Sequence, residues 1–224
     1  MEYSLEDRIA IVRENIERAA EGREVTLVGV AKTKPAELVR RAIRAGLTVI
    51  GENYVQELRD KSAEGAYEGA SVHMIGHLQV NKVKYVAGKV DLIESVDSLR
   101  LMEEISKRAG ALGSAQDVLL EVNIGGEGSK SGVPPEALSE LLDRAGELPG
   151  IRVRGLMCIP PAEDPRAYFP RMYHLFVDNK AKKYDNITMD FLSMGMSEDY
   201  EDAIKEGANM VRVGSFIFGP RNYT

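Results

Sequence analysis

Apolar and polar positions follow two alternating periods along this chain. Residues 5–20 place Leu5, Ile9, Val12 and Ile16 at helical spacing, with charged residues on the remaining positions. This spacing is typical of a helix with one buried face. Short runs rich in β-branched residues then recur to the end of the chain. Eight of them are expected strands: VTLVGVAK, TVIGEN, SVHMIG, VDLIES, QDVLLEVNI, IRVRGLM, MDFLSM and NMVRVG.

Amphipathic segments separate these expected strands. Clear examples are PAELVRRAIRAG, YVQELRDKSAEG, PPEALSELLDRAG and SEDYEDAIKEGA. Strict alternation of strands and helices predicts a parallel sheet. Eight units in about 200 residues, after one extra N-terminal helix, favour a compact (β/α)₈ barrel. The alternative is an open doubly wound sheet, which usually has about five to seven strands. No linker or compositional shift interrupts the pattern, so we expect a single domain over residues 1–224.

Composition narrows the class of protein. The 224 residues are 44% hydrophobic and 29% charged, with 35 acidic and 29 basic residues. No run of basic residues suggests nucleic-acid binding. The N-terminus does not resemble a signal peptide, and no apolar stretch reaches the ~18 residues of a membrane span. Cys158 is the only cysteine, which fits a reducing cytoplasm. The three histidines show no metal-ligand spacing, so we expect no metal site.

In a (β/α)₈ barrel the functional residues lie at the carboxyl ends of the strands. The first strand reads LVGVAKTKP. Val28, Val30 and Lys32 share one face because side chains alternate along a strand. If the valines face the barrel interior, Lys32 faces its mouth. A partly desolvated lysine there is a candidate Schiff-base nucleophile. The alternative is that Lys32 reaches out to water, as we expect of Lys34.

Other strand ends carry polar groups that could bind a ligand or could have an ordinary structural role. Glu52 and Asn53 end the second strand, and we expect both at the mouth. The Asn53 amide is suited to bind a ligand, although asparagine is also an ordinary helix cap. The segment Gly125–Gly132 reads GGEGSKSG, but Ser129 stands where a P-loop requires glycine before its lysine. We interpret this segment as a polar loop at the mouth.

The last two strands end in small, hydroxyl-bearing turns. Ser193 lies in LSMGMSED, and Gly214 and Ser215 follow the eighth strand. Barrels commonly bind phosphate at these two places, and glycine lets the backbone approach an anion closely. Arg212 shares the inward face of its strand, where an arginine is costly without a partner or ligand. With Lys32 on the neighbouring first strand, this pattern fits a phosphorylated aldehyde. Pyridoxal 5′-phosphate is the commonest such cofactor.

Seven segments together resemble the motifs of the pyridoxal phosphate homeostasis proteins, relatives of the barrel domain of alanine racemase. In chain order they are VAKTKP, GENYVQE, HMIGHLQVNK, VNIGGEGSKSG, RGLMCIPP, LSMGMSEDYEDAI and VRVGSFIFGPRNY. The resemblance covers nearly the whole chain. It implies that Lys32 forms the Schiff base with the cofactor and that Ser193, Gly214 and Ser215 hold the phosphate. It further implies that Arg212 faces the pyridine nitrogen and that Asn53 lies near the ring.

The same resemblance implies a carrier of the cofactor more than an enzyme. Arginine is always protonated and only donates, so a pyridine nitrogen facing Arg212 is unprotonated and the ring is a weaker electron sink. Alanine racemase adds a second acid–base group from a C-terminal domain, which we do not expect here. We predict a cytoplasmic, monomeric protein of vitamin B6 homeostasis, with no catalytic residue assigned and with apo-enzymes as recipients. The alternatives are a weak amino-acid racemase and a cofactor-free Schiff-base aldolase acting on a sugar phosphate.

Overall fold

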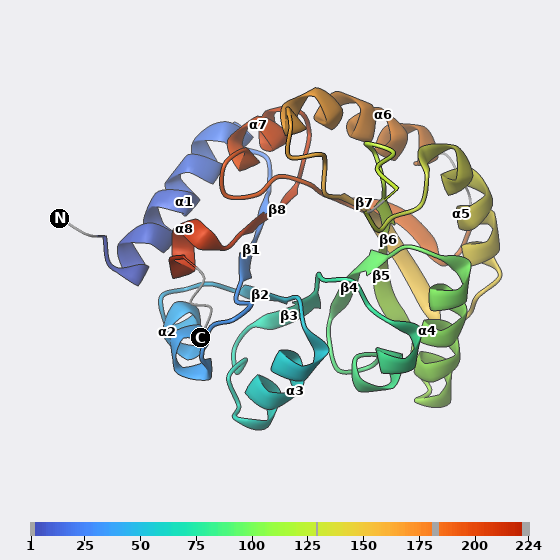
Figure 1. Ribbon diagram of the computed structural model, residues 1–224, viewed down its shortest axis with the longest axis horizontal. Helices are drawn as coiled ribbons and strands as arrows, with labels where there is room; N and C mark the ends of the chain where they lie inside the picture. The colour runs from blue at the N-terminus through green and yellow to red at the C-terminus, as the bar shows by residue number, and fades with distance from the viewer. Residues whose placement is uncertain (1–2, 129, 181–183, 221–224) are drawn as a thin grey trace.

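The protein is a closed parallel barrel. A computed structural model describes residues 3–128, 130–180 and 184–220. Each strand pairs in parallel with the next in chain order, and the eighth pairs with the first (Figure 1). The predicted (β/α)₈ fold is therefore confirmed. The strands are β1 Thr26–Val30, β2 Val49–Glu52, β3 Ser71–Met74, β4 Leu92–Val96, β5 Gln116–Val122, β6 Ile151–Cys158, β7 Ile187–Ser193 and β8 Met210–Val213.

Helices surround the barrel and follow the predicted order (Figure 1). The extra N-terminal helix, α1, starts in a capping box in which Ser4 and Asp7 bond each other's backbone N–H groups. It packs beside the helices that flank β8. The helices are α1 Leu5–Ala20, α2 Ala36–Arg44, α3 Val55–Ala63, α4 Leu99–Ala111, α5 Leu138–Gly146, α6 Phe169–Asn179, α7 Tyr200–Lys205 and α8 Ser215–Phe218, with 3₁₀ turns η1 Val80–Tyr85, η2 Pro135–Ala137 and η3 Pro165–Tyr168.

Two apolar layers form the core. The larger lies between the strands and the surrounding helices. The smaller fills the barrel interior, where Val28 is grouped with one residue from most of the other strands. Val30 packs against this inner layer, so the even-numbered residues of β1 face inward as the sequence predicts. The same alternation on β8 places Met210 and Arg212 inside the barrel.

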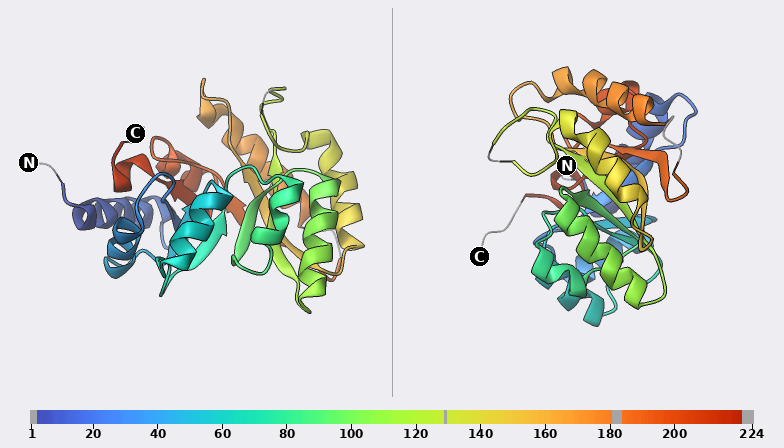
Figure 2. Two further views of the ribbon diagram at one scale, coloured as in Figure 1. Left: turned by 60° about the horizontal axis from the view of Figure 1, so that its bottom comes forward. Right: turned by 90° about the vertical axis from the view of Figure 1, so that its right-hand side faces the viewer.

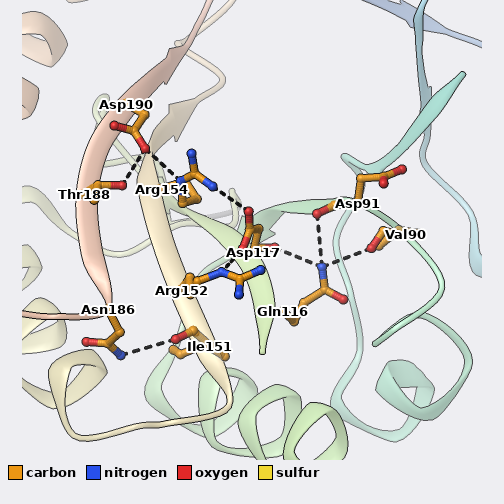
Figure 3. A network of polar contacts seen from close by, with 10 residues as sticks. All are labelled: Val90, Asp91, Gln116, Asp117, Ile151, Arg152, Arg154, Asn186, Thr188 and Asp190. Atoms are coloured by element: carbon orange, nitrogen blue, oxygen red, sulfur yellow. Dashed lines mark hydrogen bonds and ion pairs between the residues drawn. The ribbon is translucent and has the colours of Figure 1, made fainter. Parts of the chain in front are cut away.

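A network of polar side chains ties together the first halves of neighbouring strands (Figure 3). Arg154 on β6 donates to Asp117 on β5 and to Asp190 on β7, both at 2.8 Å. Gln116 donates to the carbonyl oxygens of Val90 and Asp117 at 3.1 Å. These bonds lie at the amino end of the barrel, which in this fold serves stability.

The opposite end of the barrel carries the longer loops. The loops after β5 and β6 rise side by side beyond the strands (Figure 2), and the Lys130 ammonium donates to the Pro160 carbonyl at 3.1 Å between them. Among the residues that the structure describes, no helix has the length and apolar character to cross a membrane. Within the same residues, no three His, Cys, Asp or Glu side chains are grouped as a metal site requires.

Candidate functional site

A cavity of about 440 Å³ opens at the carboxyl ends of β1, β6 and β8. This volume falls within the range of small-ligand sites, roughly 300–1,000 Å³. One wall is polar and carries Lys32, Arg212, Gly214 and Ser215. The loops after β6 and β7 add apolar residues, Ile159, Pro160, Pro161, Ala162, Pro165 and Met196, and the polar Ser197, Glu198 and Asp199. Four of the six residues singled out from the sequence therefore meet at one cavity.

Lys32 reaches the cavity from the turn that follows β1. It is partly buried and lines the wall together with Val30, on the inward side of the strand. Lys34, expected to point to water, lines the same cavity instead. Its ammonium donates to the Pro220 carbonyl at 2.7 Å, and burial, with a smaller effect of the Arg8 charge, lowers its pKa. With Lys130, three lysines thus line the cavity.

Three small residues meet at the seam between β7 and β8. The Ser197 hydroxyl lies 3.3 Å from the Gly214 backbone nitrogen and 3.2 Å from the Ser215 hydroxyl. A Cβ added at Gly214 would lie 3.1 Å from Val30 Cβ, so a larger residue would press on β1. All three residues line the cavity. They provide two hydroxyls and an unobstructed backbone close to the cationic groups, a combination suited to an anion.

Arg212 crosses the barrel interior and is held by two bonds. Its Nη1 donates to the Ser193 hydroxyl at 2.6 Å, and its Nη2 donates to the Cys158 carbonyl at 2.8 Å. The residue is 4% exposed, yet it lines the cavity. Cys158 itself is buried and burial raises its pKa to about 12, so it packs as a small apolar residue. The Ser193 hydroxyl and the Cys158 carbonyl therefore fix where the Arg212 guanidinium lies.

Ser193 has a different position from the one expected of a phosphate ligand. It does not line the cavity, and its hydroxyl is fully buried. It accepts from Arg212 and donates to Glu94 Oε2 at 2.7 Å. The Ser193 hydroxyl thus acts both as an acceptor and as a donor inside the barrel. Ser197, four residues further along the same turn, lines the cavity instead.

Glu94 completes a buried chain of polar groups that sequence reasoning missed. Its Oε1 accepts from His73 Nδ1 at 2.7 Å, and its Oε2 lies 4.0 Å from Arg212 Nη1. Burial alone would raise the Glu94 pKa, but the bond from His73 and the charges of His73 and Arg212 outweigh it and lower that pKa. Glu94 is therefore a carboxylate at neutral pH. A signal was present in the sequence, since Glu94 alternates with Leu92 on the inward face of its strand.

Asn53 and Glu52, expected together at the mouth, differ in their surroundings. Neither lines the cavity. Glu52 is fully buried under α3, where its Oε1 accepts from Lys61 at 2.7 Å and from the Tyr67 hydroxyl at 3.0 Å. Asn53 is partly buried, and its Oδ1 has no hydrogen-bond partner among the described residues. An unpartnered buried amide oxygen is the kind of group that a ligand or water satisfies.

Gly76, in the turn after β3, sets the position of the Asn53 backbone. A Cβ added at Gly76 would lie 2.3 Å from the Asn53 carbonyl oxygen. We expect Gly76→Ala to lower the free energy of unfolding by about 1–3 kcal/mol, because backbone must move to admit the methyl group. Chemical denaturation measures this change. Gly110→Ala on α4 is the control, since its added Cβ meets nothing within 4 Å; equal effects of the two substitutions would contradict the prediction.

Glu121 is a second acidic group that sequence reasoning missed. It lies near the end of β5, on the same face as Leu119 of the inner layer, and is 6% exposed. Burial, and secondarily the Asp97 charge, raises its pKa to about 7, against the smaller opposing effects of Arg212 and His77. The barrel mouth therefore has one carboxyl group that gains or loses its proton near neutral pH.

Comparisons with known proteins agree with this arrangement. Residues 8–222 match the family described as the alanine racemase N-terminal domain. The chain is 46% identical to the pyridoxal phosphate homeostasis protein of Aquifex aeolicus, over 97% of this chain and 98% of that protein. It is 41% identical to the protein of the same name from Escherichia coli K12, over 96% of each.

Solved structures of related proteins share this barrel fold. PipY of Synechococcus elongatus, solved with pyridoxal phosphate bound, is 32% identical and superposes with a TM-score of 0.86, covering 96% of this chain and all of that one. An alanine racemase of Clostridium difficile shares the fold alone, at 16% identity and a TM-score of 0.76 over 57% of that chain. The barrel, the match over residues 8–222 and the full-length identity to the curated relatives lead to one conclusion: this chain belongs to the pyridoxal phosphate homeostasis protein family.

Proposed function

We propose that this protein binds pyridoxal 5′-phosphate as a Schiff base on Lys32 and serves in intracellular homeostasis of that cofactor. The observation that carries the proposal is the meeting of Lys32, Arg212, Gly214 and Ser215 at one cavity of suitable size. The cofactor supplies an aldehyde, which condenses with a lysine amine, and an anionic phosphate. Both groups have candidate partners in this cavity. The bound cofactor in the related PipY structure supports the assignment.

The residues of this chain would divide the binding between them. We assign the phosphate to Ser197, Gly214 and Ser215, where two hydroxyls and a glycine backbone converge. Arg212 would donate to the pyridine nitrogen from the guanidinium that Ser193 and Cys158 hold in place. Ser193 would act on the cofactor only through Arg212. Asn53 stays a candidate near the ring because its buried Oδ1 has no partner among the described residues.

This arrangement favours storage of the cofactor over catalysis. A permanently protonated arginine at the pyridine nitrogen keeps that nitrogen unprotonated, which weakens the ring as an electron sink. A weak racemase is the second candidate, because the barrel is shared with alanine racemase. We further propose a cytoplasmic monomer that delivers its cofactor to apo-enzymes. Its single cysteine supports a reducing compartment.

The test of Lys32 is spectroscopic. Wild-type protein loaded with pyridoxal phosphate should show a visible absorbance band, and borohydride should fix the label on Lys32 in a peptide map. We expect Lys32→Ala to lose the band entirely. Lys34→Ala is the matched control, since that lysine lines the same cavity, and it should keep the band. A label on another lysine, or a wild-type protein that stays colourless with added cofactor, would refute the proposal.

Two further assays separate the candidate functions. A carrier passes its cofactor to an apo-enzyme and does not interconvert alanine enantiomers faster than the cofactor alone. A racemase shows turnover that Lys32→Ala abolishes. An aldolase without cofactor cleaves a sugar phosphate in the colourless protein, and borohydride then traps the substrate on Lys32.

A further inference from the structure

The turn that carries Lys32 is held by groups on its outer side. Beyond β1, the Ala31 backbone nitrogen donates to the Gly51 carbonyl at 3.0 Å, as in the sheet. The chain then turns, and the Lys34 nitrogen donates back to the Ala31 carbonyl at 3.1 Å. Thr33 has a φ of 62°, in the left-handed region that disfavours a β-branched residue. Lys32 thus lies in a turn whose next residue has an unfavourable conformation.

Two side chains of α3, Glu57 and Lys61, bond this turn from behind the strand, and Glu52 in turn bonds Lys61. Glu57 on α3 accepts from the Thr33 backbone nitrogen at 2.7 Å. The Lys61 ammonium donates to the Ala31 carbonyl and to Glu52 Oε1, both at 2.7 Å, and to Glu57 at 3.0 Å. An ammonium has three donors, so Lys61 is fully used. Two of these bonds end on Ala31 and Thr33, the residues that flank Lys32 in the sequence.

The Lys61–Glu52 pair and the bond from Lys61 to Ala31 are buried, whereas the bond from Thr33 to Glu57 is exposed. Lys61 is 5% exposed and Glu52 is fully buried. A buried ammonium is costly unless opposite charges and hydrogen bonds compensate it, and here two carboxylates and a carbonyl do so. Because these contacts approach from the outside of the barrel, the Lys32 side chain is left on the cavity side. The Lys61–Glu52 pair is thus far less exposed to water than an ordinary surface ion pair.

We propose that Glu52, Glu57 and Lys61 form a clamp that positions Lys32 for attachment of the cofactor. The inference rests on the proposed function, but the clamp is a property of the protein without cofactor. Glu57 fixes the left-handed Thr33, and Lys61 fixes the Ala31 carbonyl. Glu52 holds Lys61 in place. These three are positioning residues, since none of them lines the cavity.

Glu57→Ala is the test, because Glu57 is only partly buried and its loss leaves the Lys61–Glu52 pair intact. We expect the dissociation constant for pyridoxal phosphate to rise about tenfold, the effect of losing roughly one charged hydrogen bond. Hydrogen exchange of the Thr33 amide in the protein without cofactor should accelerate. Glu37→Ala is the matched control: Glu37 also lies in the first turn of its helix, but pairs with Arg40 and Arg44 at the surface.

A second substitution separates positioning from general stability. Thr33→Gly should restore most of the affinity in the Glu57→Ala background, because glycine adopts a positive φ without strain. Unchanged affinity and unchanged Thr33 exchange in Glu57→Ala would overturn the clamp, and so would a loss of affinity that Thr33→Gly does not reduce. If the wild-type protein bound no cofactor, the proposed function would fail. The Thr33 exchange rate would still decide whether the clamp exists.

Discussion

Glu94→Ala should lower the free energy of unfolding by about 3–5 kcal/mol, the usual result of removing one partner from a buried charged network. Glu94 is fully buried and is the only acidic group bonded to both His73 and Ser193 among the described residues. Without its carboxylate, these two groups and the nearby Arg212 guanidinium would lose their compensation. Urea denaturation near pH 7 measures the change, and calorimetry should show a melting temperature lower by roughly 6–20 °C.

The control for Glu94 is an acidic residue in an exposed network. Asp190 bonds Arg154 and Thr188 near the barrel's amino end, but its side chain is 43% exposed (Figure 3). We expect Asp190→Ala to cost below about 1 kcal/mol, as for surface ion pairs. A Glu94→Ala variant as stable as this control would show that the buried chain contributes little. Glu94→Gln should fall between the two, because the amide keeps the shape and one acceptor but loses the charge.

The fold and half of the site follow from short-range patterns in the sequence. Alternation with a period of two places Lys32 beside Val28 and Val30, and Arg212 beside Met210, on the inward face. Eight such strands in a parallel order leave few ways to close a sheet. The carboxyl ends of β1 and β8 then have to be neighbours. That is why strand parity and barrel closure are enough to assign the lysine and the arginine to one cavity.

The remaining assignments depended on contacts that the sequence does not encode locally. Ser193 bonds Glu94, which is 99 residues away along the chain, so its own turn carries no sign of that partner. On β2 all four residues are buried. Because both faces of this strand are covered, burial alone does not tell which face of the strand carries Glu52. Strand parity identifies a face, whereas the partner of a polar side chain depends on which strands and helices pack there.

The contribution of Glu121 to the stability of the protein should fall as the pH rises from about 4.5 to about 7. Its folded-state pKa is about 7, against an ordinary value of 4.5. A raised carboxyl pKa means that the folded protein binds this proton more tightly than the unfolded chain does. The folded state is therefore penalised once the proton is lost. The penalty is absent below about pH 4.5 and complete above about pH 7, where it amounts to about 3 kcal/mol.

Glu121→Gln isolates this contribution, because the amide is neutral at every pH and nearly matches the protonated acid in shape. We expect the variant and the wild type to be about equally stable at pH 4, and the variant to be more stable by up to about 3 kcal/mol at pH 8. Urea denaturation across this range gives the difference curve. Asp97→Asn should shrink the gap, since the Asp97 charge is the second cause of the raised pKa. Glu140→Gln, exposed on α5, controls for the change in net charge. A difference that stays constant from pH 4 to pH 8 would mean that Glu121 keeps an ordinary pKa, and that the barrel mouth is more polar than its burial indicates.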